Sequence, residues 1–427
     1  MSKFNQIIGY ESIKEELKWY CDILKSPERY KRLGVKAPKG LLLYGDPGVG
    51  KSLMANCLIE ESGCNAYTIR KNLPNGDFVK EIKRIFEEAS ASAPSIVFLD
   101  DIDKFANCDY THTDAEEYVT IQACMDEYRD SGVFVVATAN DVRFLPDSLR
   151  RKGRFGVQFQ IENPRVAEAE KIIAYYIKDK RVVDKLDCSE IASLLEGCSC
   201  ATLESVINEA GIIAGYQKKK TIQREDIVHA CVRYLFGSPL PKDVVIDNVA
   251  RRVALHEAGH TVVAEILRRG SVSAVCIGME SGQISGFTNV KKGDDFYFFK
   301  ENLENDIICS LGGKAAVDVI EGSQDVGCVR DLHDANHQVR NFIDDLCMRG
   351  FDTFDYGDVS NDTKALSDQK VAVETERYYQ EARRIIAENR LFVGAVMAAL
   401  LEKRILTQKE IAAIRKEFEK IINEGKN

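Results

Sequence analysis

Short apolar runs alternate with longer amphipathic stretches over the first 160 residues of the chain. The runs lie at Gly40–Tyr44, Ser95–Leu99 and 133–137, and each is followed by a polar or glycine-bearing loop. Apolar runs of this length, bounded by turn residues, are typical of strands that are buried on both faces of a parallel sheet. The pattern therefore predicts an α/β core over residues 1–160.

The pattern becomes helical after this core. Residues 161–237 contain no strand-like run and carry apolar positions at helical spacing, which predicts a small helical lid. Pro239 and Pro241 cannot continue a helix, so we place a linker at residues 238–246. Beyond it we expect one long helix, two short strands and then mainly helices, which together form a third domain at residues 247–427.

Composition and charge narrow the class of protein. The chain has 427 residues, of which 45% are hydrophobic, so it can bury two or three separate cores. A net charge of −9 without a long basic run argues against nucleic acid as a partner. The 13 cysteines are scattered and odd in number, and no apolar run reaches the roughly 20 residues that span a bilayer. We therefore expect a soluble, cytoplasmic protein with reduced thiols and no membrane span.

A phosphate-binding motif follows the first apolar run. It fits the pattern GxxxxGK[ST] and comprises Gly45, Asp46, Pro47, Gly48, Val49, Gly50, Lys51 and Ser52. In such a loop the glycines let backbone N–H groups surround phosphate oxygens, the lysine reaches the outer phosphates and the serine hydroxyl holds Mg²⁺. Asp100 and Asp101 end the second run, where the first carboxylate orients Mg²⁺ and the second positions the attacking water. These residues predict an ATPase that uses ATP with Mg²⁺.

A metal-binding motif occurs in the third domain. His256, Glu257 and His260 form the pattern HExxH, which places both imidazoles on one face of a helix. Two histidines, one further ligand and an open position for water make a hydrolytic zinc site, in which the adjacent glutamate acts as general base. Such a site also accepts other divalent ions. Spacing alone leaves several later residues open as the third ligand, namely Asp325, Asp331, His333, Asp334 and His337.

In this order along the chain, the two motifs resemble those of the FtsH-type AAA proteases, and the resemblance covers nearly the whole length. It implies that Asn140 contacts the outer phosphate or the attacking water, and that Arg151 and Arg154 are presented to the ATP of a neighbouring subunit. It also implies a homo-oligomeric ring, which we expect to be a hexamer. An isolated subunit should then hydrolyse ATP poorly, because an arginine supplied by a neighbour can contribute roughly 10³ to 10⁵ in rate.

The resemblance also selects among the candidate metal ligands. Residues 327–332 resemble the family segment that ends Asn-Asp-Leu and whose Asp is the third zinc ligand, which points to Asp331. Together with His256 and His260, this residue would bind one Zn²⁺ per subunit. Residues 286–288 match family positions on a strand near the cleft, where an extended protein substrate could pair through its main chain.

Some features depart from the family. We expect no transmembrane helix ahead of the ATPase, and therefore a protein that works free in the cytoplasm or reaches a membrane through a partner or adaptor. Arg330 replaces the usual Asn before Asp331, and Leu73-Pro74-Asn75-Gly76 stands where a substrate-gripping loop carries an aromatic residue. Asp101 stands where the family has Glu. A displacement of about 1 Å can cost about 10²-fold in rate, so the shorter side chain favours slow ATP hydrolysis.

Two enzymatic interpretations and one non-catalytic interpretation follow. In the first, the chain is an ATP-dependent zinc endopeptidase that unfolds proteins and feeds them to a peptidase chamber. In the second, the zinc peptidase cuts chains that are already unfolded, and the ATPase is weak or regulatory. In the third, the protein is a remodelling AAA protein with a structural zinc. Glu257 argues against the third interpretation, because a structural zinc site needs no adjacent general base.

Overall fold

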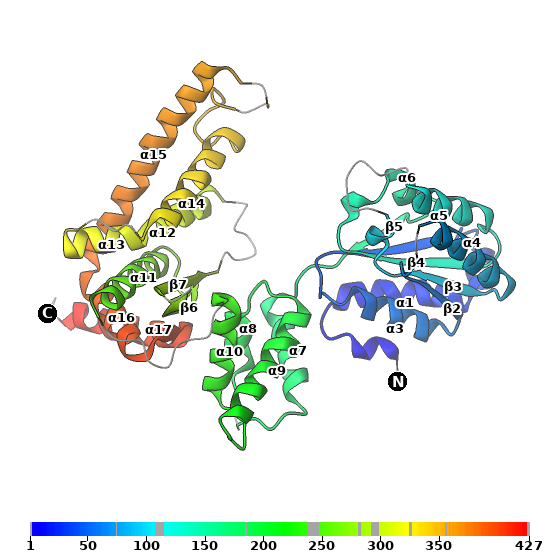
Figure 1. The fold of residues 1–427 in the computed structure, drawn as a ribbon, viewed down its shortest axis with the longest axis horizontal. Coiled ribbons are helices and arrows are strands. Elements are labelled where there is room, and N and C mark those ends of the chain that lie inside the picture. Colours follow the sequence, from blue (N-terminus) through cyan, green and yellow to red (C-terminus); the bar gives the residue numbers. More distant parts are fainter. Residues whose placement is uncertain are drawn as a thin grey trace. The chain divides into compact units, whose positions relative to one another are not determined.

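Two compact units, Met1–Ile227 and Val228–Asn427, make up the chain in the computed structural model (Figure 1). The boundary between them falls inside helix α10 (Arg224–Phe236). The predicted linker at 238–246 lies outside the described residues, and the predicted domain limits stay a prediction. The structure describes residues 2–73, 75–106, 115–183, 186–237, 247–280, 283–291, 299–323, 327–354, 357 and 359–424.

A five-stranded parallel sheet lies at the centre of the first unit, with the strand order β2-β3-β4-β1-β5. The central strand β4 and its neighbour β3 are buried along their whole length, as is most of β1, the neighbour on the other side. This arrangement confirms the α/β core that the apolar runs predict. The strands are β1 (Gly40–Tyr44), β2 (Asn65–Ile69), β3 (Ser95–Leu99), β4 (Val133–Ala139) and β5 (Val157–Gln160).

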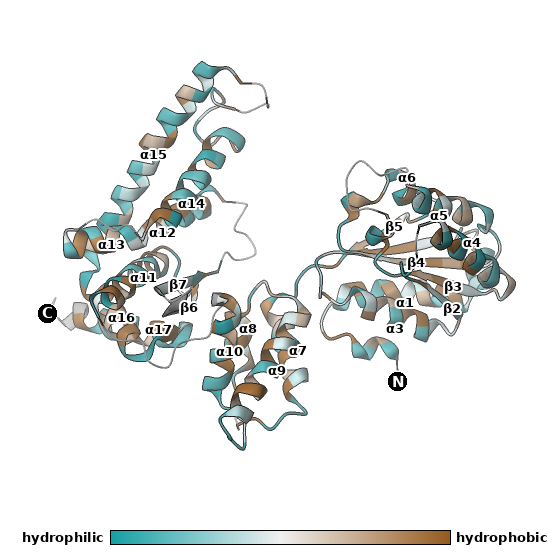
Figure 2. Ribbon diagram, viewed as in Figure 1, coloured by the Kyte–Doolittle hydropathy of each residue, from teal (hydrophilic) through white to brown (hydrophobic). Residues whose placement is uncertain are grey.

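Helices cover both faces of this sheet. One hydrophobic cluster joins the sheet to α1 (Glu11–Lys25) and α3 (Lys51–Ser62). A second cluster joins the opposite face to α4 (Asn75–Ala91) and α5 (Glu116–Glu127). Figure 1 shows the two pairs on opposite sides of the strands, and Figure 2 shows hydrophobic residues gathered along the sheet between them. The same unit also contains two short helices, α2 (Pro27–Arg32) and α6 (Asp147–Arg150).

The carboxyl ends of neighbouring strands carry the predicted nucleotide residues. Tyr44 pairs with Ala139, and Leu99 pairs with Ala137. The carboxyl ends of β1, β3 and β4 therefore lie at the same end of the sheet, where the phosphate loop and Asp100 follow. Ligands of open parallel sheets bind at this end.

Helices follow the sheet within the first unit, as predicted for the lid. The first of them are α7 (Val166–Ile177), α8 (Cys188–Leu194) and α9 (Cys200–Tyr216), and α10 begins in the same unit. The Ser199 side chain caps α9 by accepting a hydrogen bond from the Thr202 amide, at 3.3 Å. The Ala201 amide donates to the Gly48 carbonyl at 3.0 Å. The first turn of α9 therefore contacts the phosphate loop.

The second unit is mainly helical around a small antiparallel sheet with the order β7-β6-β8. The strands are β6 (Val272–Glu280), β7 (Gln283–Val290) and β8 (Ile405–Thr407). The sequence pattern did not predict β8, a strand of only three residues between long helices. The helices are α11 (Asn248–Leu267), α12 (Lys300–Ser310), α13 (Gly312–Glu321), α14 (Val329–Arg340), α15 (Asn361–Glu388), α16 (Arg390–Lys403) and α17 (Gln408–Glu424).

Helix α11 is the central element of this unit. It packs against α13, α16, β6 and β7, and its residues 254, 255, 258 and 262–264 belong to the hydrophobic core. Figure 2 shows that much of the long helix α15 is hydrophilic, in agreement with its position at the edge of the core. Over the described ranges, no helix combines the length and the apolar character that crossing a membrane requires.

Candidate functional site

The phosphate loop has a backbone conformation that favours glycine. Gly45, Gly48 and Gly50 have φ angles of +146°, +85° and +101°, a region that side chains with a Cβ rarely adopt. A Cβ on Gly45 would also overlap the backbone carbonyl of Ile161. The loop leads directly into α3, which begins at Lys51, so backbone N–H groups and a helix N-terminus are available to phosphate oxygens. This backbone suits the phosphate groups of ATP.

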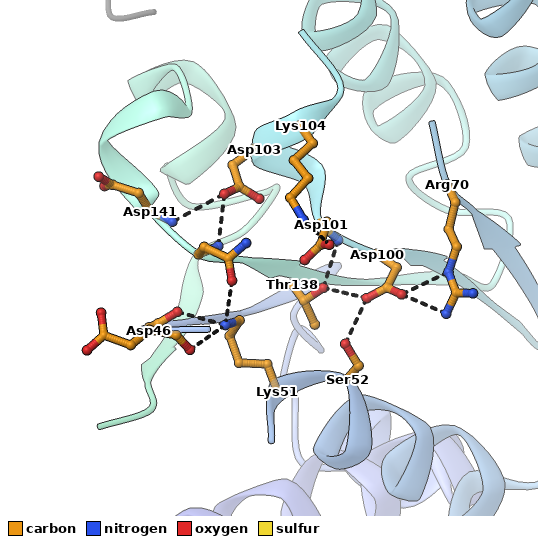
Figure 3. Close-up of polar contacts among 12 residues, drawn as sticks. Asp46, Lys51, Ser52, Arg70, Asp100, Asp101, Asp103, Lys104, Thr138 and Asp141 are labelled. Atoms are coloured by element: carbon orange, nitrogen blue, oxygen red, sulfur yellow. Dashed lines mark hydrogen bonds and ion pairs between the residues drawn. The ribbon is translucent and has the colours of Figure 1, made fainter. Parts of the chain in front are cut away.

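The Lys51 side chain lies inside the loop and is only 6% exposed. Its Nζ donates to the carbonyls of Gly45 and Asp46, at 2.7 and 2.9 Å, and to Oδ1 of Asn140, at 2.9 Å (Figure 3). Burial lowers the pKa of the Lys51 ammonium, against the opposing effect of nearby carboxylates. The structure thus brings together the lysine of the loop and Asn140, the residue that the resemblance assigns to the outer phosphate or the attacking water.

Asp100 accepts hydrogen bonds at both carboxylate oxygens. Its Oδ1 accepts from the hydroxyls of Ser52 and Thr138, each at 2.9 Å. Its Oδ2 accepts from Nε and Nη2 of Arg70, at 2.9 and 2.7 Å (Figure 3). The contact between Ser52 and Asp100 is the arrangement expected for a serine that holds Mg²⁺ next to an orienting carboxylate. Sequence reasoning missed Thr138 and Arg70, since neither belongs to a motif.

Asp101 lies beside Asp100 but faces a different partner. Its backbone is left-handed, with φ +56°, and its carboxylate pairs with Lys104 Nζ at 2.6 Å. One further acid, Asp103, is 4% exposed and accepts from the backbone amides of Asn140 and Asp141, at 3.0 and 3.3 Å. It therefore fixes the backbone that presents Asn140. The acidic pattern after β3 contains Asp103, so sequence analysis could have found it.

The two arginines that the resemblance presents to the ATP of a neighbouring subunit differ in their surroundings. Arg151 is exposed, whereas Arg154 is only 6% exposed. The Arg154 guanidinium donates to Asp126 Oδ2 at 2.6 Å and to Gln122 Oε1 at 2.9 Å, both on α5. In this structure Arg154 thus stabilises its own loop. The roles of both arginines toward a neighbouring subunit stay predictions.

The histidines of the HExxH motif face each other and Asp331. The distance between the two Nε2 atoms, of His256 and His260, is 3.1 Å. Asp331 Oδ2 lies 2.9 Å from Nε2 of His256 and 3.4 Å from Nε2 of His260. In a tetrahedral site with zinc-to-ligand distances of about 2.0 to 2.1 Å, ligand atoms are roughly 3.3 Å apart. The separations therefore fit a zinc ion bound by these side chains.

The structure separates the candidates for the third ligand. Among the described residues, only Asp331 joins the two histidines in a group of possible metal ligands. His333, Asp334 and His337 lie on the same helix, α14, but outside that group, and Asp325 lies outside the described residues. Asp331 as the third ligand stays a prediction, and the distances from its Oδ2 to both imidazoles fit those between the ligands of one zinc ion.

Close helix packing places the histidines. A Cβ on Gly313 of α13 would lie 2.5 Å from Nε2 of both His256 and His260, and a Cβ on Gly259 would overlap the Gly312 carbonyl. Helices α11 and α13 can therefore approach this closely only because these positions lack side chains. His260 Nδ1 lies 2.7 Å from the Cys309 carbonyl, to which it donates, so that Nε2 keeps a lone pair for a metal.

Glu257 lies on α11, and its side chain is enclosed against strand β7. Its side chain is 6% exposed, and burial raises the pKa of its carboxyl, although the neighbouring imidazoles oppose this effect. The Thr288 hydroxyl donates to Glu257 Oε2 at 2.6 Å. A Cβ on Gly286 would overlap the Glu257 side chain. Two residues of β7 therefore define where the carboxylate lies, one through a hydrogen bond and one through the absence of a side chain.

A cavity of about 1290 Å³ opens in front of these groups. Its lining includes His256, Glu257, His260, Asp331 and residues 285–290 of β7. Strand β7 pairs with β6 on one side and is an edge strand of the described sheet. An extended peptide could therefore pair with the main chain of β7 within reach of Glu257.

Comparisons with known protein families match both sites. The family model "ATPase family associated with various cellular activities (AAA)" matches residues 41–163. The model of peptidase family M41 matches residues 244–414. The first range contains the phosphate loop and the acids after β3, and the second contains all residues of the metal cluster. The matches agree with the cofactors that the motifs predict, Zn²⁺ and ATP with Mg²⁺.

Curated relatives align along almost the whole chain. The ATP-dependent zinc metalloprotease FtsH 2 of Thermoanaerobacter sp. (strain X514) is 29% identical over 97% of this chain and 83% of its own length. FtsH of Mycoplasma pneumoniae is 31% identical over 96% of this chain, which spans only 61% of that relative. FtsH of Bacillus subtilis is 29% identical over 96% of this chain and 69% of its own length. The two family matches and these alignments show that the chain belongs to the FtsH-type AAA zinc metalloproteases.

Proposed function

We propose that this protein is an ATP-dependent zinc endopeptidase that degrades unfolded or misfolded proteins. The observation that carries the proposal is the enclosed Glu257 carboxylate next to the cluster of His256, His260 and Asp331. It occurs in the same chain as a phosphate loop with its lysine in place. ATP hydrolysis would then drive unfolding and movement of the substrate toward the peptidase site.

In the peptidase reaction, His256, His260 and Asp331 would hold the zinc ion. Zinc, when bound, activates a water molecule and polarises the substrate carbonyl. Glu257 would accept the proton of that water and later give it to the leaving amine. Thr288 orients the carboxylate through its hydrogen bond to Oε2. The edge strand β7 would bind the substrate backbone, which suits a protease that accepts many unfolded sequences.

In the ATPase reaction, Lys51 would contact the outer phosphates, and Ser52 and Asp100 would hold Mg²⁺. Asp101 and Asn140 would position the attacking water. The exposed Arg151 would reach the ATP of a neighbouring copy in a homo-oligomeric ring, which we infer to be a hexamer. The contacts of Arg154 with α5 support a role in holding the loop that presents Arg151.

The proposed division of labour follows the predicted domains. Residues 1–160 would bind ATP, and residues 161–237 would form the lid that responds to it. The contact between the first turn of α9 and the phosphate loop supports this role of the lid. The linker at 238–246 would join the motor to the peptidase at 247–427. Adaptors or a membrane-bound partner would deliver substrates.

Degradation of two labelled substrates tests the proposal. One substrate is permanently unfolded and the other is folded, and each is followed with and without ATP. We expect ATP-dependent cleavage of the folded protein. Glu257→Gln should abolish cleavage of both substrates, and a zinc chelator should do the same. Glu402→Gln, at an exposed position of α16, provides a matched control and should have no effect.

The outcomes separate the interpretations. If the unfolded substrate alone is cut, regardless of ATP, the motor function is wrong and the ATPase is regulatory. If neither substrate is cut, the peptidase function is wrong. Cleavage that survives in Glu257→Gln would contradict the proposed role of this carboxylate.

A further inference from the structure

Asp100, the carboxylate expected to orient Mg²⁺, is already surrounded by donors from its own chain. Two hydroxyls donate to Oδ1 and two guanidinium nitrogens of Arg70 approach Oδ2 (Figure 3). A carboxylate offers about four acceptor positions, so these four donors occupy its full capacity. The Asp100 side chain is 11% exposed, and the Arg70 side chain is 65% exposed. Arg70 therefore covers the solvent side of an otherwise enclosed acid.

The sheet register places Arg70 next to this acid. Ile69, the last residue of β2, pairs with Leu99, the last residue of β3. The Asp100 amide also donates to the Ile69 carbonyl at 3.1 Å. The residues that follow the two strands therefore start side by side, and of their two side chains only that of Arg70 is exposed.

The second acid has a similar partner. Asp101 pairs with Lys104 at 2.6 Å, and the Lys104 side chain is 57% exposed. The hydrogen bond to Asp101 raises the pKa of the Lys104 ammonium, which keeps it charged. Both acids that follow β3 are thus held in ion pairs by exposed cations, one from the end of β2 and one from the turn after β3.

We propose that Arg70 is a positioning residue that competes with Mg²⁺ for Asp100. A divalent cation next to Asp100 would repel the guanidinium and would need the same carboxylate, so the ion pair has to break when Mg²⁺–nucleotide binds. Arg70 then sets how much Mg²⁺ the ATPase needs. The proposal rests on the nucleotide function proposed above, because it assumes that Asp100 serves the Mg²⁺ site.

Nucleotide binding as a function of Mg²⁺ concentration tests this role. We would measure binding of a fluorescent N-methylanthraniloyl-ATP to the full chain, for the wild type and Arg70→Gln. The half-saturating Mg²⁺ concentration should be about fivefold lower in Arg70→Gln, the change expected when an exposed ion pair no longer has to be broken. Affinity measured in a chelator of Mg²⁺ should change less than twofold. High salt should shrink the difference, because salt screens exposed charges.

Three further variants complete the test. Arg70→Lys keeps the charge but loses the planar guanidinium, so it should lie between the wild type and Arg70→Gln. Lys104→Gln should lower the Mg²⁺ requirement less than Arg70→Gln, since it frees Asp101 and not Asp100. Arg84→Gln is the matched control, because Arg84 is an exposed arginine that pairs with Glu81 and Glu88 on its own helix. This control should leave the Mg²⁺ requirement unchanged.

Each alternative outcome decides against the proposal. An unchanged Mg²⁺ requirement in Arg70→Gln would mean that the ion pair has no function in Mg²⁺ binding. A higher requirement would mean that Arg70 supports the Mg²⁺ site and does not compete with it. If the wild type fails to bind the nucleotide at any Mg²⁺ concentration, the proposed ATPase function is itself wrong, which distinguishes that failure from the other two.

Discussion

The phosphate site and the metal site hold their functional groups by different means. In the phosphate site, acids at the ends of strands pair with exposed cations, such as Arg70 and Lys104. In the metal site, a backbone carbonyl fixes His260 and the Thr288 hydroxyl fixes Glu257. Helices α11 and α13 also pack closely around the histidines. The first arrangement has to change when its ligand binds. The second is already close to the geometry that zinc requires.

This difference follows from what each site does. A motor ATPase passes through several nucleotide states, and its site must rearrange between them. Ion pairs that are exposed to solvent suit this role, because they break and form again at little cost in free energy. A peptidase site performs the same hydrolysis in each cycle and gains from groups that are fixed in advance. The comparison therefore predicts that small changes in packing around the zinc ligands should cost more than changes in the exposed ion pairs around Asp100 and Asp101.

The largest effect is expected from Gly313→Ala. The added methyl group would lie 2.5 Å from Nε2 of both His256 and His260, so either the imidazoles or α13 must shift. Zinc affinity should fall by about 100-fold, the upper range for residues that support metal ligands, and peptidase activity should fall with it. Zinc content after competition with a chelator measures the effect. Nucleotide binding by the same variant should be unchanged.

Gly394→Ala is the matched control for this substitution. Gly394 lies on α16, and a Cβ there would meet no atom within 4 Å. This variant should keep its zinc and gain slightly in stability, because alanine favours a helix by about 1 kcal/mol relative to glycine. Full zinc affinity in Gly313→Ala would show that the metal site adapts easily, and the comparison between the two sites would then be wrong.

The sequence was most informative where a function depends on local spacing. The phosphate loop needs glycines at fixed positions in one turn, and His256 and His260 need only the period of a helix, so both patterns are readable without a structure. The alternation of apolar runs likewise predicted the parallel sheet, which the structure confirms. The short strand β8 was missed, because three residues carry too little pattern.

Contacts between distant residues could not be predicted in this way. The Cys309 carbonyl reaches His260, and the Thr138 hydroxyl reaches Asp100, only because helices and strands pack together. No spacing rule relates such pairs. Asp331 was selected by resemblance to a family, since the residues alone left five candidates for the third ligand. Arg70 was missed for the same reason as Thr138, as its contact depends on the register between β2 and β3.

The next largest effect is expected from Thr288→Val, which tests the position of the general base separately from the binding of zinc. The substitution keeps the shape of the side chain but removes the donor to Glu257 Oε2. Loss of a hydrogen bond to a charged group should lower kcat/KM for an unfolded substrate by about tenfold. Zinc content should stay unchanged. Steady-state cleavage and metal analysis of one preparation provide both measurements.

Thr261→Val is the control for the loss of a hydroxyl. Thr261 lies next to His260 on α11, is fully buried, and its Oγ1 has no hydrogen-bond partner among the described residues. Activity of this variant should equal that of the wild type. If both threonine variants lose activity equally, general disturbance of α11 and β7 would explain the result, and no specific role of Thr288 would remain.

The smallest effect, and a gain in activity, is expected from Asp101→Glu in the phosphate site. Asp101 pairs with Lys104, and its carboxylate is one methylene shorter than that of the glutamate that the resemblance implies at this position. The longer side chain should recover part of the about 10²-fold that a displacement of 1 Å can cost, so we expect ATP hydrolysis to rise about fivefold. Phosphate release measures the rate, and Asp130→Glu, at a highly exposed position, is the control.

Cleavage of an unfolded substrate without ATP should not change in Asp101→Glu, because that reaction depends on the fixed groups of the metal site. A fall in ATP hydrolysis would mean that the site is already adjusted to the shorter acid, and that the exposed ion pairs around it are as closely fitted as the helices around zinc.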